Sequence, residues 1–134
     1  MDRMKWLLPL CLALIVAACD GTTGPTTPID QDFTLAPGER ITVAGTSTRI
    51  TFVRVDGDSR CPADALCIQG GDAVVKIEVD SSGGSRESLD LHTGSMAPVT
   101  YRDLIIALIQ LSPYPFSSRT IAPDEYRATL RVTR

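Results

Sequence analysis

The fold class is decided by one segment near the middle of the chain, Ala73-Val-Val-Lys-Ile-Glu-Val-Asp80. Its odd-numbered positions are all apolar, and its last three even-numbered positions are charged. A period of two places these sets on opposite faces of an extended chain, which predicts a half-buried β-strand. A turn sequence, Ser81-Ser-Gly-Gly-Ser85, follows, and beyond it Leu89 and Leu91 alternate with polar residues. The sequence therefore predicts an antiparallel hairpin here.

Similar runs flank this hairpin. Residues 48–55 are rich in β-branched side chains, and residues 126–133 alternate apolar positions with arginine and threonine. Shorter alternating runs around Phe33 and Ile41 are separated by the turn residues Pro37-Gly38. About seven or eight short strands, with turns every 8–12 residues, predict an all-β protein with an antiparallel sandwich or barrel.

The segment Tyr101–Leu111 is compatible with two structures. Helical spacing relates Leu104, Ile105, Leu108 and Ile109, whereas strand spacing relates Ile105, Ala107, Ile109 and Leu111. The isoleucines, the flanking turn residues and the strands elsewhere favour a strand buried on both faces. A helix is the alternative.

The N-terminus is typical of an export signal. A short basic head with Arg3 and Lys5 precedes an apolar run from Trp6 to Val16. That run is too short for a spanning helix, which needs about 20 apolar residues. The sequence Val16-Ala-Ala-Cys19 resembles a bacterial lipobox, which implies cleavage before Cys19 and lipid on its thiol. The alternative is a plain secretory signal that leaves Cys19 as an ordinary thiol.

These features predict three parts: a cleaved lipoprotein signal peptide over residues 1–18, a lipidated Cys19 with a flexible Thr/Gly/Pro linker over residues 19–31, and a single β-domain over residues 32–134. The protein would lie on the non-cytoplasmic side of the bacterial cell envelope, held to a bilayer by acylated Cys19. Asp20 directly follows the lipidated position, and an acidic residue there resembles the signal for retention in the inner membrane of enteric bacteria. The choice between inner and outer membrane stays open.

Composition excludes several classes of function. With 13 basic and 16 acidic residues the net charge is −3, so the chain has no electrostatic footprint for nucleic acid. No nucleophile elbow, zinc-protease motif or phosphate loop occurs. The single histidine, His92, is expected in solvent. We therefore predict no catalytic residue, no cofactor and no metal.

Four cysteines are present, and two of them belong to the exported body. Cys11 would leave with the signal and Cys19 would carry lipid, which leaves Cys61 and Cys67. In an oxidising compartment this pair predicts a short-range disulfide. A metal pair is the alternative, but no further cysteine is left to complete such a site.

The disulfide lies in a long loop, residues 56–72, which is the predicted binding loop. Its candidate residues are Asp56, Asp58, Arg60, Asp64, Gln69 and Asp72. A loop closed by a disulfide is pre-organised, which lowers the entropic cost of binding. The alternative is a structural role, in which the disulfide pins a crossover and Arg60 pairs with a nearby aspartate. Calcium at the four aspartates is a further hypothesis, but their spacing is not that of an EF-hand.

Part of this loop carries a family resemblance. The run Asp58-Ser-Arg-Cys-Pro62, with Cys67 and Gly70, resembles the signature of a set of small uncharacterised bacterial lipoproteins. Leu111-Ser-Pro-Tyr-Pro115 and Tyr126 match the same pattern. Those proteins have an aromatic residue between the second cysteine and the glycine, where this chain has Gln69. The resemblance implies a lipoprotein and implies no activity.

We expect a non-catalytic binding or envelope-interaction module that contacts an envelope protein through residues 56–72. One alternative is an inhibitor of an envelope hydrolase or protease that presents the Cys61–Cys67 loop as a wedge. Another is a small aspartate-dependent enzyme. Tyr114 and Phe116 are expected to cap one end of the domain, with an exposed apolar ridge as the alternative.

Overall fold

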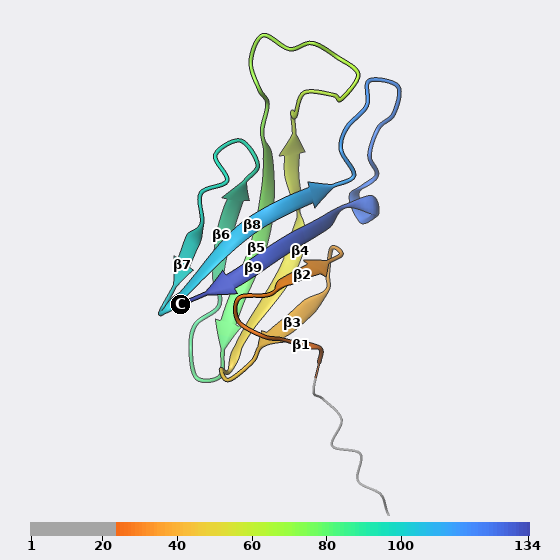
Figure 1. The fold of residues 1–134 in the computed structure, drawn as a ribbon. Helices are drawn as coiled ribbons and strands as arrows, with labels where there is room; N and C mark the ends of the chain where they lie inside the picture. The colour runs from red at the N-terminus through yellow and green to blue at the C-terminus, as the bar shows by residue number, and fades with distance from the viewer. Residues whose placement is uncertain (1–23) are drawn as a thin grey trace, which may run out of the picture.

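The structure is a computed structural model that describes residues 24–134 (Figure 1). The predicted signal peptide and the predicted lipid attachment at Cys19 lie outside the described residues. Within residues 24–134 no helix has the length and apolar character to cross a membrane.

Two β-sheets pack face to face. The five-stranded sheet has the order β1-β3-β4-β5-β6, and the four-stranded sheet has the order β2-β9-β8-β7 (Figure 1). This confirms the predicted all-β class and makes the architecture a sandwich. The strand bounds are β1 Thr26–Thr27, β2 Asp32–Leu35, β3 Arg40–Val43, β4 Thr48–Asp58, β5 Ala73–Ser81, β6 Glu87–His92, β7 Val99–Tyr101, β8 Leu104–Ser112 and β9 Arg127–Thr133, with a 3-10 turn η1 at Pro123–Glu125.

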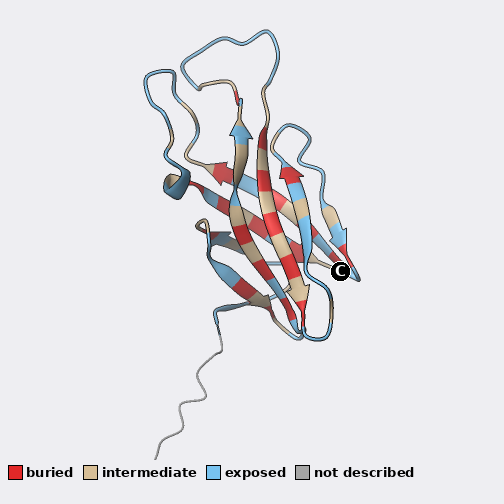
Figure 2. Ribbon diagram, turned by 180° about the vertical axis from the view of Figure 1, so that it is seen from behind, coloured by how far each residue is buried: buried red, intermediate tan, exposed pale blue. Residues whose placement is uncertain are grey.

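The predicted hairpin is β5 and β6, and it pairs in an antiparallel register with Val75 opposite Leu91. On its other side β5 pairs with β4, where Ile50 lies opposite Val79. Every odd-numbered residue of β5 is buried, so the period of two in the sequence is the period of burial (Figure 2). The core forms where this face meets the inner face of the four-stranded sheet, which contributes Leu104, Ile106 and Leu130.

The ambiguous segment 101–111 contains β8, so the strand prediction is confirmed and the helix does not form. The prediction of burial on both faces is wrong. Leu104, Ile106 and Leu108 are buried, whereas Ile105 and Ile109 are each 38% exposed. The reason is that the sandwich has two layers, so the outer face of β8 meets no other described element. A register shift between Leu108 and Gln110 turns Leu111 back into the core.

The structure also corrects the predicted linker. Residues 24–31 are not a free tether, because β1 pairs in parallel with β3 and Thr27 is buried. Ile29 packs against the core, and the Asp30 amide donates to the carbonyl of Val132 at 2.8 Å. These contacts outweigh the polar, Pro-rich composition of the segment. The domain therefore begins before Asp32.

The connections between strands divide between the two ends of the sandwich. The β4–β5, β6–β7 and β8–β9 loops project from one end (Figure 1). The β3–β4 and β5–β6 turns and the first described residues lie toward the opposite end (Figure 1). The disulfide loop and the start of the described chain are therefore far apart along the long axis.

A pair of isoleucine substitutions tests this arrangement. Ile77→Ala removes a fully buried side chain, so we expect the free energy of unfolding to fall by about 2–5 kcal/mol. Ile105→Ala trims a side chain on the outer face of β8, and we expect a loss of about 1 kcal/mol or less. Urea denaturation measures both. Equal losses would contradict the two-layer arrangement.

Candidate functional site

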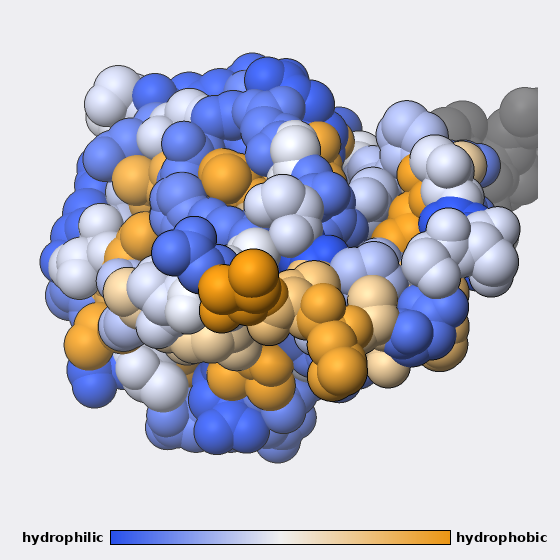
Figure 3. All heavy atoms as spheres, turned by 90° about the horizontal axis from the view of Figure 1, so that it is seen from above, coloured by the Kyte–Doolittle hydropathy of each residue, from blue (hydrophilic) through white to orange (hydrophobic). Residues whose placement is uncertain are grey.

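The three loops at one end of the sandwich, residues 59–72, 93–98 and 113–122, are here called the loop end. Among the described residues seven large hydrophobic side chains are exposed, and five of them belong to the loop end: Leu66, Ile68, Met96, Tyr114 and Phe116. Leu66 and Ile68 are as open as in an extended peptide, at 106% and 105%. Figure 3 views this end from above and shows hydrophobic side chains standing out of a largely hydrophilic surface. The expected cap at Tyr114 and Phe116 is therefore an exposed ridge.

The loop end carries few charged side chains. Residues 93–98 have none, residues 113–122 have Arg119, which is paired with Glu125, and residues 59–72 have Arg60, Asp64 and Asp72. The charged groups of Arg60, Asp64 and Asp72 are each engaged in contacts with neighbouring segments. The exposed apolar residues are thus surrounded mostly by small and uncharged side chains.

The predicted disulfide between Cys61 and Cys67 is confirmed, with the two Cα atoms 6.0 Å apart. Leu66 lies inside the segment it closes, and Ile68 lies immediately outside. The closed segment is also fixed to the β8–β9 loop. The amide of Ala63 donates to the carbonyl of Pro115 at 2.9 Å, and the carboxylate of Asp64 accepts from the amide of Ser117 at 2.8 Å. The apolar tip is therefore presented by a pre-organised loop.

A buried ion pair forms the base of the loop end. The Arg60 side chain is only 6% exposed and meets the Asp58 carboxylate through two contacts, Nε to Oδ1 at 2.8 Å and a terminal nitrogen to Oδ2 at 2.6 Å. The same guanidinium donates to the carbonyls of Leu111 at 2.8 Å and Pro113 at 3.0 Å. Tyr126 donates its hydroxyl to Asp58 Oδ2 at 3.0 Å. One cluster thus joins the end of β4, the end of β8 and the start of β9.

The electrostatics of this cluster follow from its burial and its hydrogen bonds. Burial raises the pKa of Asp58, but hydrogen bonds from Arg60 and Tyr126 outweigh burial and leave that pKa below its ordinary value. Burial, followed by the hydrogen bond to Asp58, raises the pKa of Tyr126. At neutral pH the cluster therefore contains a carboxylate, a guanidinium and a neutral phenol.

The other end of the disulfide loop is held by Asp72. Its carboxylate accepts from His92 Nδ1 at 2.6 Å and from the amide of Gly94 at 2.8 Å, which ties the loop to the β6–β7 connection. The hydrogen bond from His92 is the main cause of the lowered pKa of Asp72. The backbone carbonyl of Asp72 accepts from the amide of Ser59 at 2.7 Å, which closes the base of the loop.

The six predicted binding residues do not converge on one ligand. Asp56 is on the outer face of the five-stranded sheet, where it pairs with Arg54 and Lys76. The Asp58–Arg60 pair, Asp64 and Asp72 each hold a different part of the loop end together. Gln69 is exposed on the disulfide loop. Among residues 24–134 no three His, Cys, Asp or Glu side chains are grouped as metal ligands. The expected pairing of Arg60 with a nearby aspartate is confirmed, with Asp58 as the partner.

The residues that sequence reasoning missed are Leu66, Ile68 and Met96. Their one signal was the presence of large apolar side chains in segments otherwise rich in turn residues. Because apolar residues are usually buried, the pattern alone did not distinguish exposed ones from core ones.

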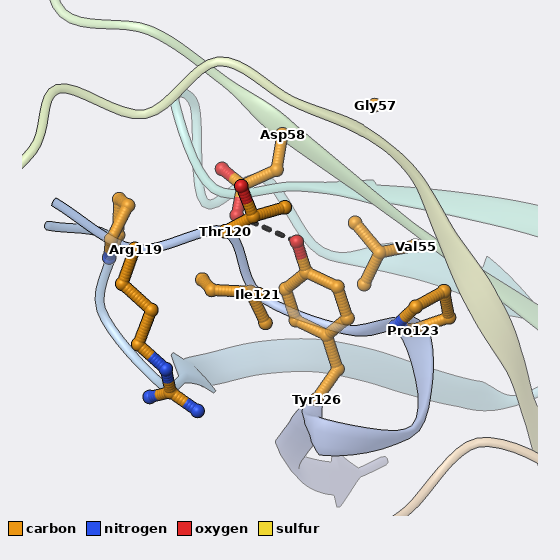
Figure 4. A pocket seen from close by; sticks show the side chains of 9 residues that line it. Val55, Gly57, Asp58, Arg119, Thr120, Ile121, Pro123 and Tyr126 are labelled. Carbon is orange, nitrogen blue, oxygen red and sulfur yellow. Dashed lines mark hydrogen bonds between the residues drawn. The ribbon is translucent and has the colours of Figure 1, made fainter. Parts of the chain in front are cut away.

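A pocket of about 370 Å³ lies beside the β8–β9 loop. In Figure 4 the ring of Tyr126 stands in the pocket with its hydroxyl directed to Asp58. The guanidinium of Arg119, also in the lining, is ion-paired with Glu125. The apolar part of the lining is formed by Val55, Pro115, Ile121 and Pro123. Pro115 therefore belongs both to the pocket and to the loop end.

Two neighbouring glycines test how the disulfide loop is closed. A Cβ at Gly71 would lie 1.4 Å from the carbonyl oxygen of Ser59, whereas one at Gly70 would meet nothing within 4 Å. We expect Gly71→Ala to break the contact between Ser59 and Asp72 and to lower the free energy of unfolding by about 1–3 kcal/mol. Gly70→Ala should change it little. Amide hydrogen exchange of Ser59 measures the contact, and urea denaturation measures the free energy of unfolding. Equal exchange and equal stability of the two variants would refute the close approach of Gly71 to the Ser59 carbonyl.

The Asp58–Arg60 pair predicts a specific dependence on pH. The pKa of Asp58 is lowered in the folded protein, so its contribution is complete above the unfolded value of about 4 and is lost as pH falls through the folded value. Asp58→Asn should cost roughly 3–5 kcal/mol at pH 7, because it leaves Arg60 buried without its partner charge. The difference from the unmodified protein should shrink below about pH 4.

The control for that experiment is Asp80→Asn, which removes a partner of the more exposed Arg49. It should cost about 1 kcal/mol or less at pH 7. Urea denaturation at several pH values measures both variants. A loss for Asp58→Asn that is the same at pH 3 and pH 7 would contradict the assignment.

A comparison of the chain with family models, with curated proteins and with solved structures finds no match.

Proposed function

We propose that this protein is a non-catalytic binding module of the bacterial cell envelope, anchored through lipid on Cys19, and that its loop end recognises a protein partner. The observation that carries the proposal is the complete exposure of Leu66 and Ile68 on a loop fixed by a disulfide. Full burial of such a side chain is worth about 1.5–3 kcal/mol, so each gains from being covered. Because the loop is already ordered, little of that gain is spent on ordering it.

The chemistry of the loop end favours a protein partner. The centre of a protein interface is depleted in charged residues and enriched in aromatic residues and methionine. Tyr114, Phe116 and Met96 are exposed here, and Arg60 is buried against Asp58. A surface that binds nucleic acid or anionic lipid needs exposed basic residues to contact phosphate. The one further basic residue of these loops, Arg119, is paired with Glu125.

The direction of the loop end supports an envelope partner. The described chain begins toward the end of the sandwich opposite the loops (Figure 1). Gly24 is five residues from Cys19 in the sequence, so lipid on Cys19 would hold the far end of the domain close to the bilayer. The loop end would then face away from that bilayer, toward other envelope components.

The projecting tip of the disulfide loop supports the inhibitor alternative. Leu66 and Ile68 flank Cys67 on a projecting, covalently closed loop. Such a convex apolar tip has the shape that fills a cleft, and an envelope hydrolase or protease would offer one. The enzyme alternative has weaker support, because Asp58, Asp64 and Asp72 are each engaged in holding loops together.

Site-specific photo-crosslinking in cells tests the proposal. A photoreactive residue in place of Leu66 in the full chain should give one dominant protein adduct, because Leu66 would be covered by the partner. The matched control is Ser82, which is exposed in the β5–β6 turn at the opposite end and should give no such adduct. Ile68→Asp should reduce the Leu66 adduct at least about tenfold, since it places a charge in an apolar contact.

Equal labelling from Leu66 and Ser82, or adducts with lipid alone, would contradict a protein-binding loop end. If the adduct contains an envelope hydrolase or protease, its activity in the presence of the full chain distinguishes inhibition from simple binding.

A further inference from the structure

We propose that the pocket beside the β8–β9 loop receives one uncharged apolar side chain of the partner protein, aliphatic or aromatic. The inference rests on the proposed function and names the chemistry that the partner must supply. With a volume of about 370 Å³ the pocket is at the small end of ligand sites, which suits a single large side chain. It adjoins the loop end, because Pro115 lines it and accepts the hydrogen bond from Ala63 of the disulfide loop.

The acidic group in the pocket has no capacity for a cationic ligand. Asp58 accepts hydrogen bonds from the Arg60 amide at 3.2 Å, from Arg60 Nε at 2.8 Å, from a terminal nitrogen of Arg60 at 2.6 Å and from the Tyr126 hydroxyl at 3.0 Å. A carboxylate offers about four acceptor sites, so all of them are used. An ammonium group would have to displace Arg60 or Tyr126 from this cluster.

The basic group in the pocket is likewise engaged. Arg119 is paired with Glu125, whose carboxylate also accepts from the amide of Ala122 at 2.7 Å. An anionic ligand would compete with this pair for the guanidinium. Both charged side chains of the lining are therefore neutralised within the protein, and the pocket gives no advantage to a charged ligand of either sign.

Apart from Thr120 and the backbone at Gly57, the rest of the lining is mostly apolar. The ring of Tyr126 and the side chains of Val55 and Ile121 face the space in Figure 4, with Pro123 beside them. Val55 and Ile121 are partly buried against the core, so these walls are set by the packing of the domain. An aromatic ring placed against Tyr126 would gain from stacking as well as from burial. These walls select an apolar side chain by shape and by polarity.

Nuclear magnetic resonance of the full chain, with labelled methyl groups, tests the inference with two probes. N-acetylphenylalaninamide should shift the methyl resonances of Val55 and Ile121 saturably and show intermolecular contacts with the Tyr126 ring. N-acetyl-lysinamide, similar in length but cationic, should leave them unchanged. Thr120→Trp should fill the pocket and weaken binding of the first probe at least about tenfold. Ser82→Trp, at an exposed position in the β5–β6 turn at the opposite end, should leave binding intact.

The core methyl resonances of Leu91 show whether the Thr120→Trp variant is folded. If that variant does not fold, the intermolecular contacts between N-acetylphenylalaninamide and the Tyr126 ring in the unmodified chain decide whether the pocket binds the probe. Absence of saturable shifts with N-acetylphenylalaninamide, or tighter binding of N-acetyl-lysinamide, overturns the inference. If N-acetylphenylalaninamide does not bind the pocket but the Leu66 crosslink to a protein still forms, this inference is refuted and the proposed function is not. Loss of the Leu66 crosslink refutes the proposed function, whatever the probes show.

Discussion

The loop end depends on the ion pair between Asp58 and Arg60. A buried guanidinium is costly unless its charge is paired and its N–H groups find acceptors. Here a carboxylate and the carbonyls of Leu111 and Pro113 provide them, and the ring of Tyr114 lies under the guanidinium with its centroid 5.4 Å away. Because these acceptors belong to different segments, satisfying one side chain fixes the relative positions of two loops. The buried guanidinium of Arg60 therefore orders the exposed tip of the disulfide loop above it.

The two other carboxylates of the disulfide loop are likewise engaged in contacts with neighbouring segments. Asp64 accepts from Ser117 of the β8–β9 loop, and Asp72 from His92 at the end of β6. The outward-facing side chains of these loops include five large apolar ones, which the ordered loops hold in solvent. The charged side chains thus position the loops, and the exposed apolar side chains are available for contact.

The fold could be predicted largely from local patterns. The alternation in β5 and β6 is a local property, and it specified both the strands and their buried face. The outer face of β8 could not be predicted, because exposure of Ile105 and Ile109 depends on how many layers the domain has. The pairing of β1 with β3 depends on contacts across the sequence, so composition alone was misleading. Cys61–Cys67 followed from elimination, whereas the contact of Tyr126 with Asp58 spans 68 residues and has no local signal.

The path of the chain between β1 and β2 has a mechanical consequence. β1 pairs with β3 in the five-stranded sheet, and a few residues later β2 pairs with β9 in the four-stranded sheet. Between them Ile29 packs into the core and Asp30 bonds to Val132. The segment from β1 to β2 therefore pairs with both layers of the sandwich. Tension applied through the N-terminus is shared between the two sheets before it reaches the hairpin β5–β6.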